Sequence, residues 1–234
     1  MTISHVQSGT NQVAGAATSI TVTLGSAVGS GNCVVGAVTR NDNEAVVTIT
    51  DDKGNTYTNL DQVHDASTGY YVTSFVLGNI INGPVTITAT FGGSEGFRTI
   101  AVDEYSGVSV VSNPNDGHAG QLQAAPGTGT DAVTSGAFTT TANGNLIWSC
   151  TTNAAGHAPS TGTGFNLRNS TFVLLFTEDK IQSSAGSIAG TWTQGVGSDN
   201  PVTLAVALKA ATGGASSGDS AFQNGAMFLL LSHV

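Results

Sequence analysis

The sequence predicts an all-β protein built as a two-sheet antiparallel β-sandwich of jelly-roll-like type. Apolar and polar residues alternate with a period of two along most of the chain, and β-branched residues are frequent. Gly, Asn and Asp interrupt this alternation roughly every ten residues, as turns between short strands do. No segment shows the apolar spacing of an amphipathic helix.

The alternation predicts strands in both halves of the chain. Roughly a dozen strands exceed the number in an immunoglobulin-type sandwich, which favours a jelly roll. A polar, glycine-rich stretch over 112–132 separates the two halves, and no strand is predicted in it. The expected strands are 20–24, 33–39, 46–50, 56–60, 70–77, 85–91, 98–105, 133–140, 145–152, 164–169, 172–181, 188–193 and 202–209.

Two local patterns refine this fold. The sequence DDKGN at 51–55 supplies an Asp to start a turn and Gly54 for a positive φ, which predicts a hairpin turn. The segments GSGNCVVGAVTRN (29–41) and ANGNLIWSCTTN (142–153) share a GN start, an apolar run and a Thr near the end. This echo indicates two related halves. Within the second segment, Trp148 alternates in phase with Leu146 and Cys150, which predicts a core position.

The end of the chain differs from the rest. We expect a sandwich domain over 1–211, a Gly/Ser linker over 212–220, and an apolar segment over 221–234. That segment could be a last strand of its own sandwich, a strand donated to a neighbouring subunit, or a disordered remnant. Burial of its large side chains favours docking onto another subunit or a host assembly. The docking residues are Phe222, Met227, Phe228, Leu229, Leu230 and Leu231.

Composition excludes several functions. Six Lys and Arg against 15 Asp and Glu give a formal charge of −9, which disfavours nucleic acid as a partner. No apolar run approaches the roughly 20 residues of a membrane span.

The chain starts with a polar segment, so we expect that a leader was removed or that the protein leaves its cell without one, as virion proteins released by lysis do. Cys33 and Cys150 could be bridged, but their apolar surroundings favour free, buried thiols.

The order of several motifs resembles a family of β-sandwich modules. SGNCVVGAVT, VTITDDKGNTYT, NIINGPVTITATF, AVDEYSGV, NGNLIWSC, TEDKIQSSAGSIAGTW and PVTLAVALKA follow one another over about residues 3 to 211. This succession is similar to modules of bacterial surface or secreted proteins and of phage structural proteins. The resemblance implies a jelly-roll-like fold associated with adhesion or carbohydrate contact, without an agreed enzymatic activity. Cys33 departs from the aliphatic residue usual in such modules.

The carboxylates Glu104, Glu178 and Asp179 are the best candidates for general acid and base catalysis. A glycosidase is one interpretation. The preferred interpretation pairs them with Lys180, Arg98 or Thr hydroxyls, so we predict no catalytic residues.

Metal sites have little support in the sequence. The five histidines do not have zinc-site spacing, and we predict no cofactor. Calcium is the one cation considered, because oxygen ligands cluster in loops, although none of these loops has the order of a calcium-binding loop. The oxygen-rich groups are Asp42 with Glu44, Asp51 with Asp52, and Asn113 with Asn115 and Asp116.

Glycan contact would use exposed aromatic rings flanked by polar groups. Tyr70 and Tyr71 are neighbours on one predicted strand, so one of them should face outward. Trp192 is the third candidate because it precedes the polar loop QGVGSDN.

Together these observations predict a non-enzymatic structural or display protein. We expect a virion decoration or fibre-type component, such as part of a phage capsid surface, that docks through its C-terminal segment onto another copy or another structural subunit. The alternative is a carbohydrate-binding adhesion module that contacts surface glycans, and a glycoside-active enzyme is third. The expected location is the virion surface or the extracellular space, with no membrane insertion.

Overall fold

The structure, a computed structural model, describes residues 2–41, 47–124, 131–152, 158–169, 174–195 and 200–211. These residues form sixteen β-strands in antiparallel sheets and contain no helix, which confirms the predicted all-β sandwich. Accordingly, the described part of the chain includes no helix with the length and apolar character of a membrane span.

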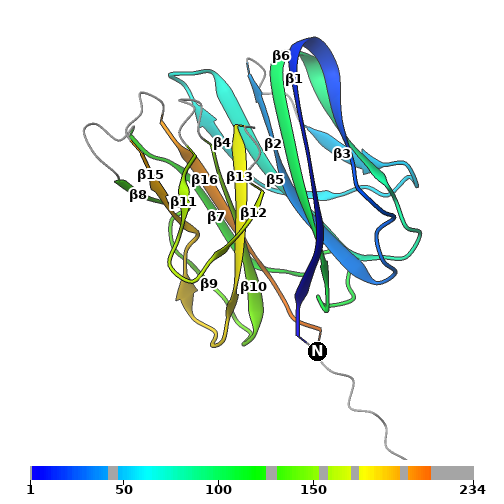
Figure 1. The fold of residues 1–234 in the computed structure, drawn as a ribbon, viewed down its shortest axis with the longest axis vertical. Helices are drawn as coiled ribbons and strands as arrows, with labels where there is room; N and C mark the ends of the chain where they lie inside the picture. The colour runs from blue at the N-terminus through cyan, green and yellow to red at the C-terminus, as the bar shows by residue number, and fades with distance from the viewer. Residues whose placement is uncertain are drawn as a thin grey trace, which may run out of the picture.

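Two large sheets face each other, and two small sheets cover one of them (Figure 1). The first sheet has the order β1-β6-β2-β5-β4, with β3 paired to β6, and the second has the order β12-β13-β10-β16-β7. The first comprises β1 (Ser4–Thr23), β2 (Asn32–Asn41), β3 (Thr48–Asp51), β4 (Thr58–Asp65), β5 (Tyr70–Ile80) and β6 (Thr86–Ser106). The second comprises β7 (Asn115–Leu122), β10 (Asn145–Thr152), β12 (Asn166–Asn169), β13 (Leu175–Gln182) and β16 (Val202–Leu208). The small sheets are β11 (Ser160–Thr161), β15 (Thr191–Gln194) and β8 (Asp131–Thr134), and β14 (Ser187–Ile188) with β9 (Phe138–Thr139).

The main core lies between the two large sheets. Because side chains alternate along a strand, Cys33 and Val35 of β2 point inward and meet Trp148 and Cys150 of β10 in one apolar cluster. Trp148 is fully buried, as its phase predicts. Both cysteines are free and buried, so the preferred interpretation of these thiols is confirmed.

The outer faces of both large sheets are also buried. The strands β1 and β6 stay paired well beyond the part of β6 that pairs with β2, as Figure 1 shows, and the beginning of β6 also pairs with β3. Val22, Ile49 and Ile87 from this paired region belong to the same cluster as Val34 and Phe75, which lie on the outer face. On the second sheet, Phe176 packs with Trp192 and Val133 of the small sheets. The fold therefore has four layers.

The two halves of the chain have the same topology. The strand order β1-β6-β2-β5-β4 is reproduced by β7-β16-β10-β13-β12, so that β2 and β10 are the central strands of their sheets. These are the two segments whose sequences echo each other. The duplication also makes the edge where β1 lies near β12 equivalent to the edge where β4 lies near β7.

Several element boundaries differ from the prediction. β7 lies inside the stretch 112–132, where no strand is predicted, because its Gly and polar residues conceal the alternation. The predicted strands 85–91 and 98–105 are parts of one strand, β6, whose glycines at 92, 93 and 96 interrupt the apolar pattern. The Asp51–Asn55 turn is as predicted, with Gly54 at φ 81°. The linker 212–220 and the apolar segment 221–234 lie outside the described residues and remain predictions.

Candidate functional site

Glu104 is a structural clamp on the turn before β2. Its side chain is fully buried. One carboxylate oxygen accepts hydrogen bonds from the Gly29 backbone N–H at 2.8 Å and from Nδ2 of Asn32 at 2.5 Å. The other accepts a hydrogen bond from Nε2 of Gln7 at 2.5 Å. A carboxylate held in this way is occupied by its own fold. The partners expected from the sequence, Lys180, Arg98 or Thr hydroxyls on an edge or surface, are wrong for Glu104, which is buried and bound by backbone and amide N–H groups.

Asp116 repeats this arrangement in the second half. It accepts hydrogen bonds from the Ala142 backbone N–H at 3.0 Å and from Nδ2 of Asn145 at 2.6 Å, in the turn before β10. Thr141 donates from both its backbone N–H and its hydroxyl, and Nζ of Lys209 lies 3.1 Å from Oδ1. Burial by itself would raise the pKa of Asp116, but the hydrogen bonds from Thr141, Asn145 and Lys209 outweigh it and hold the pKa well below its usual range.

Glu178 is buried beneath the small sheets. The Gly162 backbone N–H donates to Oε2 at 2.9 Å, whereas Oε1 has no hydrogen-bond partner among the described residues. Burial raises the pKa of Glu178 to about 8, against the opposing effect of the Gly162 N–H. The carboxyl group is therefore mostly neutral at pH 7 and is fully buried.

A polar network crosses between the two large sheets. Nε1 of Trp148 donates to Oδ2 of Asp103 at 2.7 Å, and the hydroxyl of Tyr105 donates to Oδ2 of Asp179 at 2.6 Å. Arg168 binds Asp179 through Nε at 2.6 Å and Nη2 at 2.9 Å, a bidentate pair. Burial, with the charges of Asp103 and Asp179, raises the pKa of Tyr105 well above its usual value.

Ser8, His5 and Asp103 lie together but lack the order of a catalytic triad. The Ser8 hydroxyl donates to Oδ1 of Asp103 at 2.5 Å, and Nε2 of His5 lies 2.9 Å from the same hydroxyl oxygen. The nearest Asp103 oxygen is 3.7 Å from Nε2 of His5, the ring nitrogen that also faces Ser8. In a triad the carboxylate binds the opposite ring nitrogen and orients the base. The cluster therefore fixes β1 to β6.

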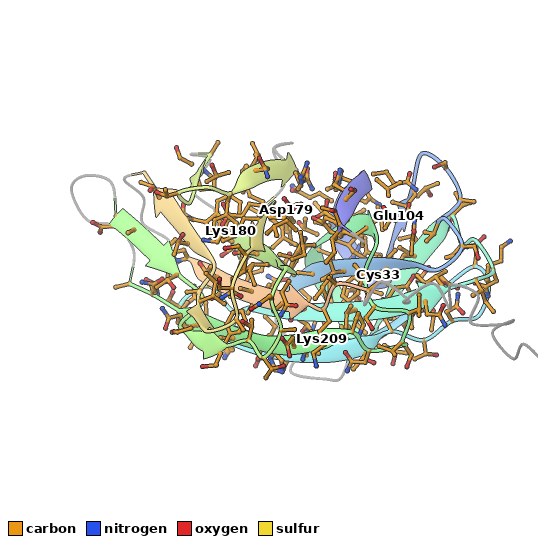
Figure 2. The ribbon with its side chains drawn as sticks, turned by 90° about the horizontal axis from the view of Figure 1, so that it is seen from below. Cys33, Glu104, Asp179, Lys180 and Lys209 are labelled. Atoms are coloured by element: carbon orange, nitrogen blue, oxygen red, sulfur yellow. The ribbon has the colours of Figure 1, made fainter. Side chains whose placement is uncertain are left out.

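A polar cavity lies at the edge where β1 meets β12. Its volume is about 320 Å³. Figure 2 shows Asp179 and Glu104 towards one side of the molecule and Lys209 towards the other. The residues that line the cavity are Ile3, Ser4, His5, Leu146, Asn166, Arg168, Asp179 and Ile181.

The aromatic candidates for glycan contact are placed differently from one another. Trp192 is only 1% exposed, and its Nε1 donates to Oγ of Ser149 at 3.0 Å. Its ring has no exposed face on which a sugar could stack, so the prediction is wrong for Trp192. The polar residues that follow it suggested exposure, but alternation turns the ring inward.

Tyr70 and Tyr71 are half-buried and lie on opposite faces of the first sheet. Tyr70 faces inward, packs edge-on against Phe97, and borders a cavity of only about 20 Å³. Tyr71 faces outward between its neighbours on the adjacent strands. His64 stacks on its ring at 4.0 Å, and the Arg40 guanidinium lies 5.2 Å from its centre. Because β5 runs between β2 and β4, these neighbours approach from opposite sides.

The described aspartates proposed as calcium ligands accept hydrogen bonds from backbone N–H groups. Asp51 accepts hydrogen bonds from the Lys53 and Asn55 backbones, and Asp52 accepts from the backbones of Val85 and Thr86. Asp42 and Glu44 lie outside the described residues. Among the residues that are described, no group of three or more His, Cys, Asp or Glu side chains could hold a metal ion.

The predicted docking residues Phe222, Met227, Phe228, Leu229, Leu230 and Leu231 lie outside the described part of the chain, so docking stays a prediction. Sequence reasoning missed the role of Asp116 and the convergence of His5, Asn166 and Arg168 on one cavity. The GN echo was the available signal for the first. No signal in the sequence brings residues 5, 166 and 168 together.

Comparisons with family models, with curated proteins and with solved structures give no match to this chain. The resemblance to β-sandwich modules stays a prediction.

Proposed function

We propose that the chain is a non-enzymatic structural or display protein, a virion decoration or fibre-type component that docks through its C-terminal segment. One observation supports the non-enzymatic part: the carboxylates best placed in sequence for catalysis are occupied or shielded by the fold. Glu104 accepts hydrogen bonds from the turn before β2, and Glu178 is buried beneath the small sheets. A general acid or base has to reach the proton that it transfers.

A layered body with two buried outer faces also suits display. Strands that are covered on both faces resist local opening, because each opening exposes apolar surface to water. The apolar residues of 221–234 would then supply attachment, since burying such side chains contributes roughly 1.5 to 3 kcal/mol each.

The non-enzymatic proposal is tested by incubating the full chain with a panel of p-nitrophenyl glycosides. We expect no nitrophenol release above buffer, and Glu104→Gln and Glu178→Gln should alter only the unfolding transition. Release that disappears in either variant would overturn the proposal.

The second candidate function is a carbohydrate-binding adhesion module. The polar cavity between β1 and β12 favours it, because convergent donors and acceptors beside apolar side chains are typical of small-ligand sites. Binding of the full chain to a glycan array supports this function, and no binding to any glycan contradicts it.

A further inference from the structure

The cavity between β1 and β12 has an equivalent in the duplicated fold, and the equivalent edge is bridged. Where β4 meets β7, Nδ1 of His118 lies 2.7 Å from Oδ2 of Asp61. The strands also approach closely, because a Cβ added to Gly120 would lie 3.0 Å from Cγ2 of Val63. At the β1 edge the two sheets instead leave about 320 Å³ between them. One topology therefore gives a bridged edge and a hollow edge.

The polar groups of the hollow edge are held in place by the fold. Asp179 is fixed from two sides by Tyr105 and Arg168. The Arg168–Asp179 pair uses Nε and Nη2, and within the described residues Nη1 of Arg168 has no hydrogen-bond partner. Groups that are fixed before binding lose little conformational entropy when a ligand arrives.

Two further groups in the cavity can bind a ligand. The amide of Asn166 makes only long contacts with Asp179, at 3.4 and 3.5 Å, through Nδ2. Its Oδ1 accepts no hydrogen bond from the described residues. His5 uses Nε2 toward Ser8, which leaves its other ring nitrogen for a ligand. A guanidinium donor, an amide and an imidazole match the alternating donors and acceptors of hydroxyl groups.

The charges select a neutral ligand. The guanidinium charge of Arg168 is already balanced by Asp179 at 2.6 Å, and the chain carries a formal charge of −9. An anion would therefore meet net repulsion. Ile181, which lines the cavity and is 44% exposed, supplies apolar contact for the C–H face of a sugar ring. The volume is at the lower end of small-molecule sites, which suits about one or two sugar rings.

We propose that the cavity bordered by His5, Asn166, Arg168 and Asp179 is the binding site for a neutral saccharide unit. This inference rests on the second proposed function, carbohydrate binding, and names its site and ligand class. The site lies on the β1–β12 edge, not at Tyr71.

The test is an NMR titration of the full chain with glucose, galactose, mannose and N-acetylglucosamine, each compared with glucuronate. We expect at least one neutral sugar to shift the resonances of His5 and Arg168 and to bind more tightly than glucuronate. Asn166→Ala should weaken binding about tenfold through loss of one amide contact. Asn166→Trp, which fills the cavity from an exposed position on β12, should abolish it.

His64→Ala is the matched control, because it removes the ring that stacks on Tyr71 and leaves the cavity intact. Sugar binding that His64→Ala abolishes and Asn166→Trp leaves unchanged would overturn the cavity site while keeping the carbohydrate-binding function. Tighter binding of glucuronate than of every neutral sugar would overturn the proposed ligand class. No binding of any sugar by the wild-type chain would overturn the function and the site together.

Discussion

Asn32 and Asn145 hold equivalent positions at the start of the two central strands, and each donates its side-chain amide to a buried carboxylate on another strand. Asn32 binds Glu104 of β6 at 2.5 Å, and Asn145 binds Asp116 of β7 at 2.6 Å. Each follows a glycine with positive φ, Gly31 at 81° and Gly144 at 75°. The GN echo is therefore a repeated turn whose glycine adopts a left-handed conformation.

The clamp at Asp116 makes stability depend on acid pH. The folded pKa of Asp116 lies below the ordinary value of 3.8. The contribution of the Asp116 carboxylate to the free energy of unfolding is therefore present above about pH 4. It is lost as pH falls further, because the carboxylate takes up its proton at a higher pH in the unfolded chain than in the folded chain. We expect Asp116→Asn to lower the free energy of unfolding by roughly 2 kcal/mol at pH 7 and by less at pH 3, as measured by urea denaturation. Asp131→Asn, at an exposed position, should leave stability unchanged; an equal loss there would contradict the clamp.

Glu178 has the opposite pH dependence. Its pKa rises from 4.5 to about 8 on folding, so the native state holds a proton that the unfolded state releases between these values. The stability of the wild type should therefore fall as pH rises from 4.5 to 8. Glu178→Gln removes this ionisation and should be more stable than the wild type at pH 8.5, on the order of 3 kcal/mol, with a smaller difference at pH 4. Thermal unfolding at both pH values measures this, and a pH-independent difference would refute the assignment.

Tyr105 joins the two large sheets through Asp179. Tyr105→Phe removes the hydroxyl alone and leaves one buried carboxylate oxygen with fewer donors. We expect a loss of about 1.5 to 3 kcal/mol, the range for a hydrogen bond to a charged group. Tyr71→Phe is the control, because the hydroxyl of Tyr71 makes no hydrogen bond with the described residues, and it should cost less than about 0.5 kcal/mol. Equal effects in chemical denaturation would argue against the inter-sheet bond.

Cys33 and Cys150 should be inert in the native protein. Desolvation by burial raises the pKa of both thiols far above neutrality, so little thiolate forms. Ellman's reagent should detect no reactive thiol in the folded chain and both thiols in 6 M guanidinium chloride. Rapid native reaction would show that one of these side chains is exposed to solvent.

Much of the fold is predictable from local patterns, whereas the site is not. The phase of Trp148 identifies the core face because alternation is a property of the strand itself. β7 was missed because its glycines and polar residues hide that alternation. The cavity is lined by residues more than 160 positions apart, such as His5 and Arg168, and periodicity does not encode their proximity. The exposure predicted for Trp192 is wrong because the small sheets pack on the second large sheet. This packing buries the Trp192 ring against Phe176.

The docking proposal is tested most directly by sedimentation velocity of the full chain over a range of concentrations. The proposal predicts species larger than the 23.4 kDa monomer for the wild type, and monomer alone for the combined variant Leu229→Ser, Leu230→Ser, Leu231→Ser. Ile81→Ser, at a 74% exposed position on the body, is the control and should sediment as the wild type does. A wild type that stays monomeric at every concentration and binds no structural partner, as the variant does, would contradict attachment through the C-terminal segment.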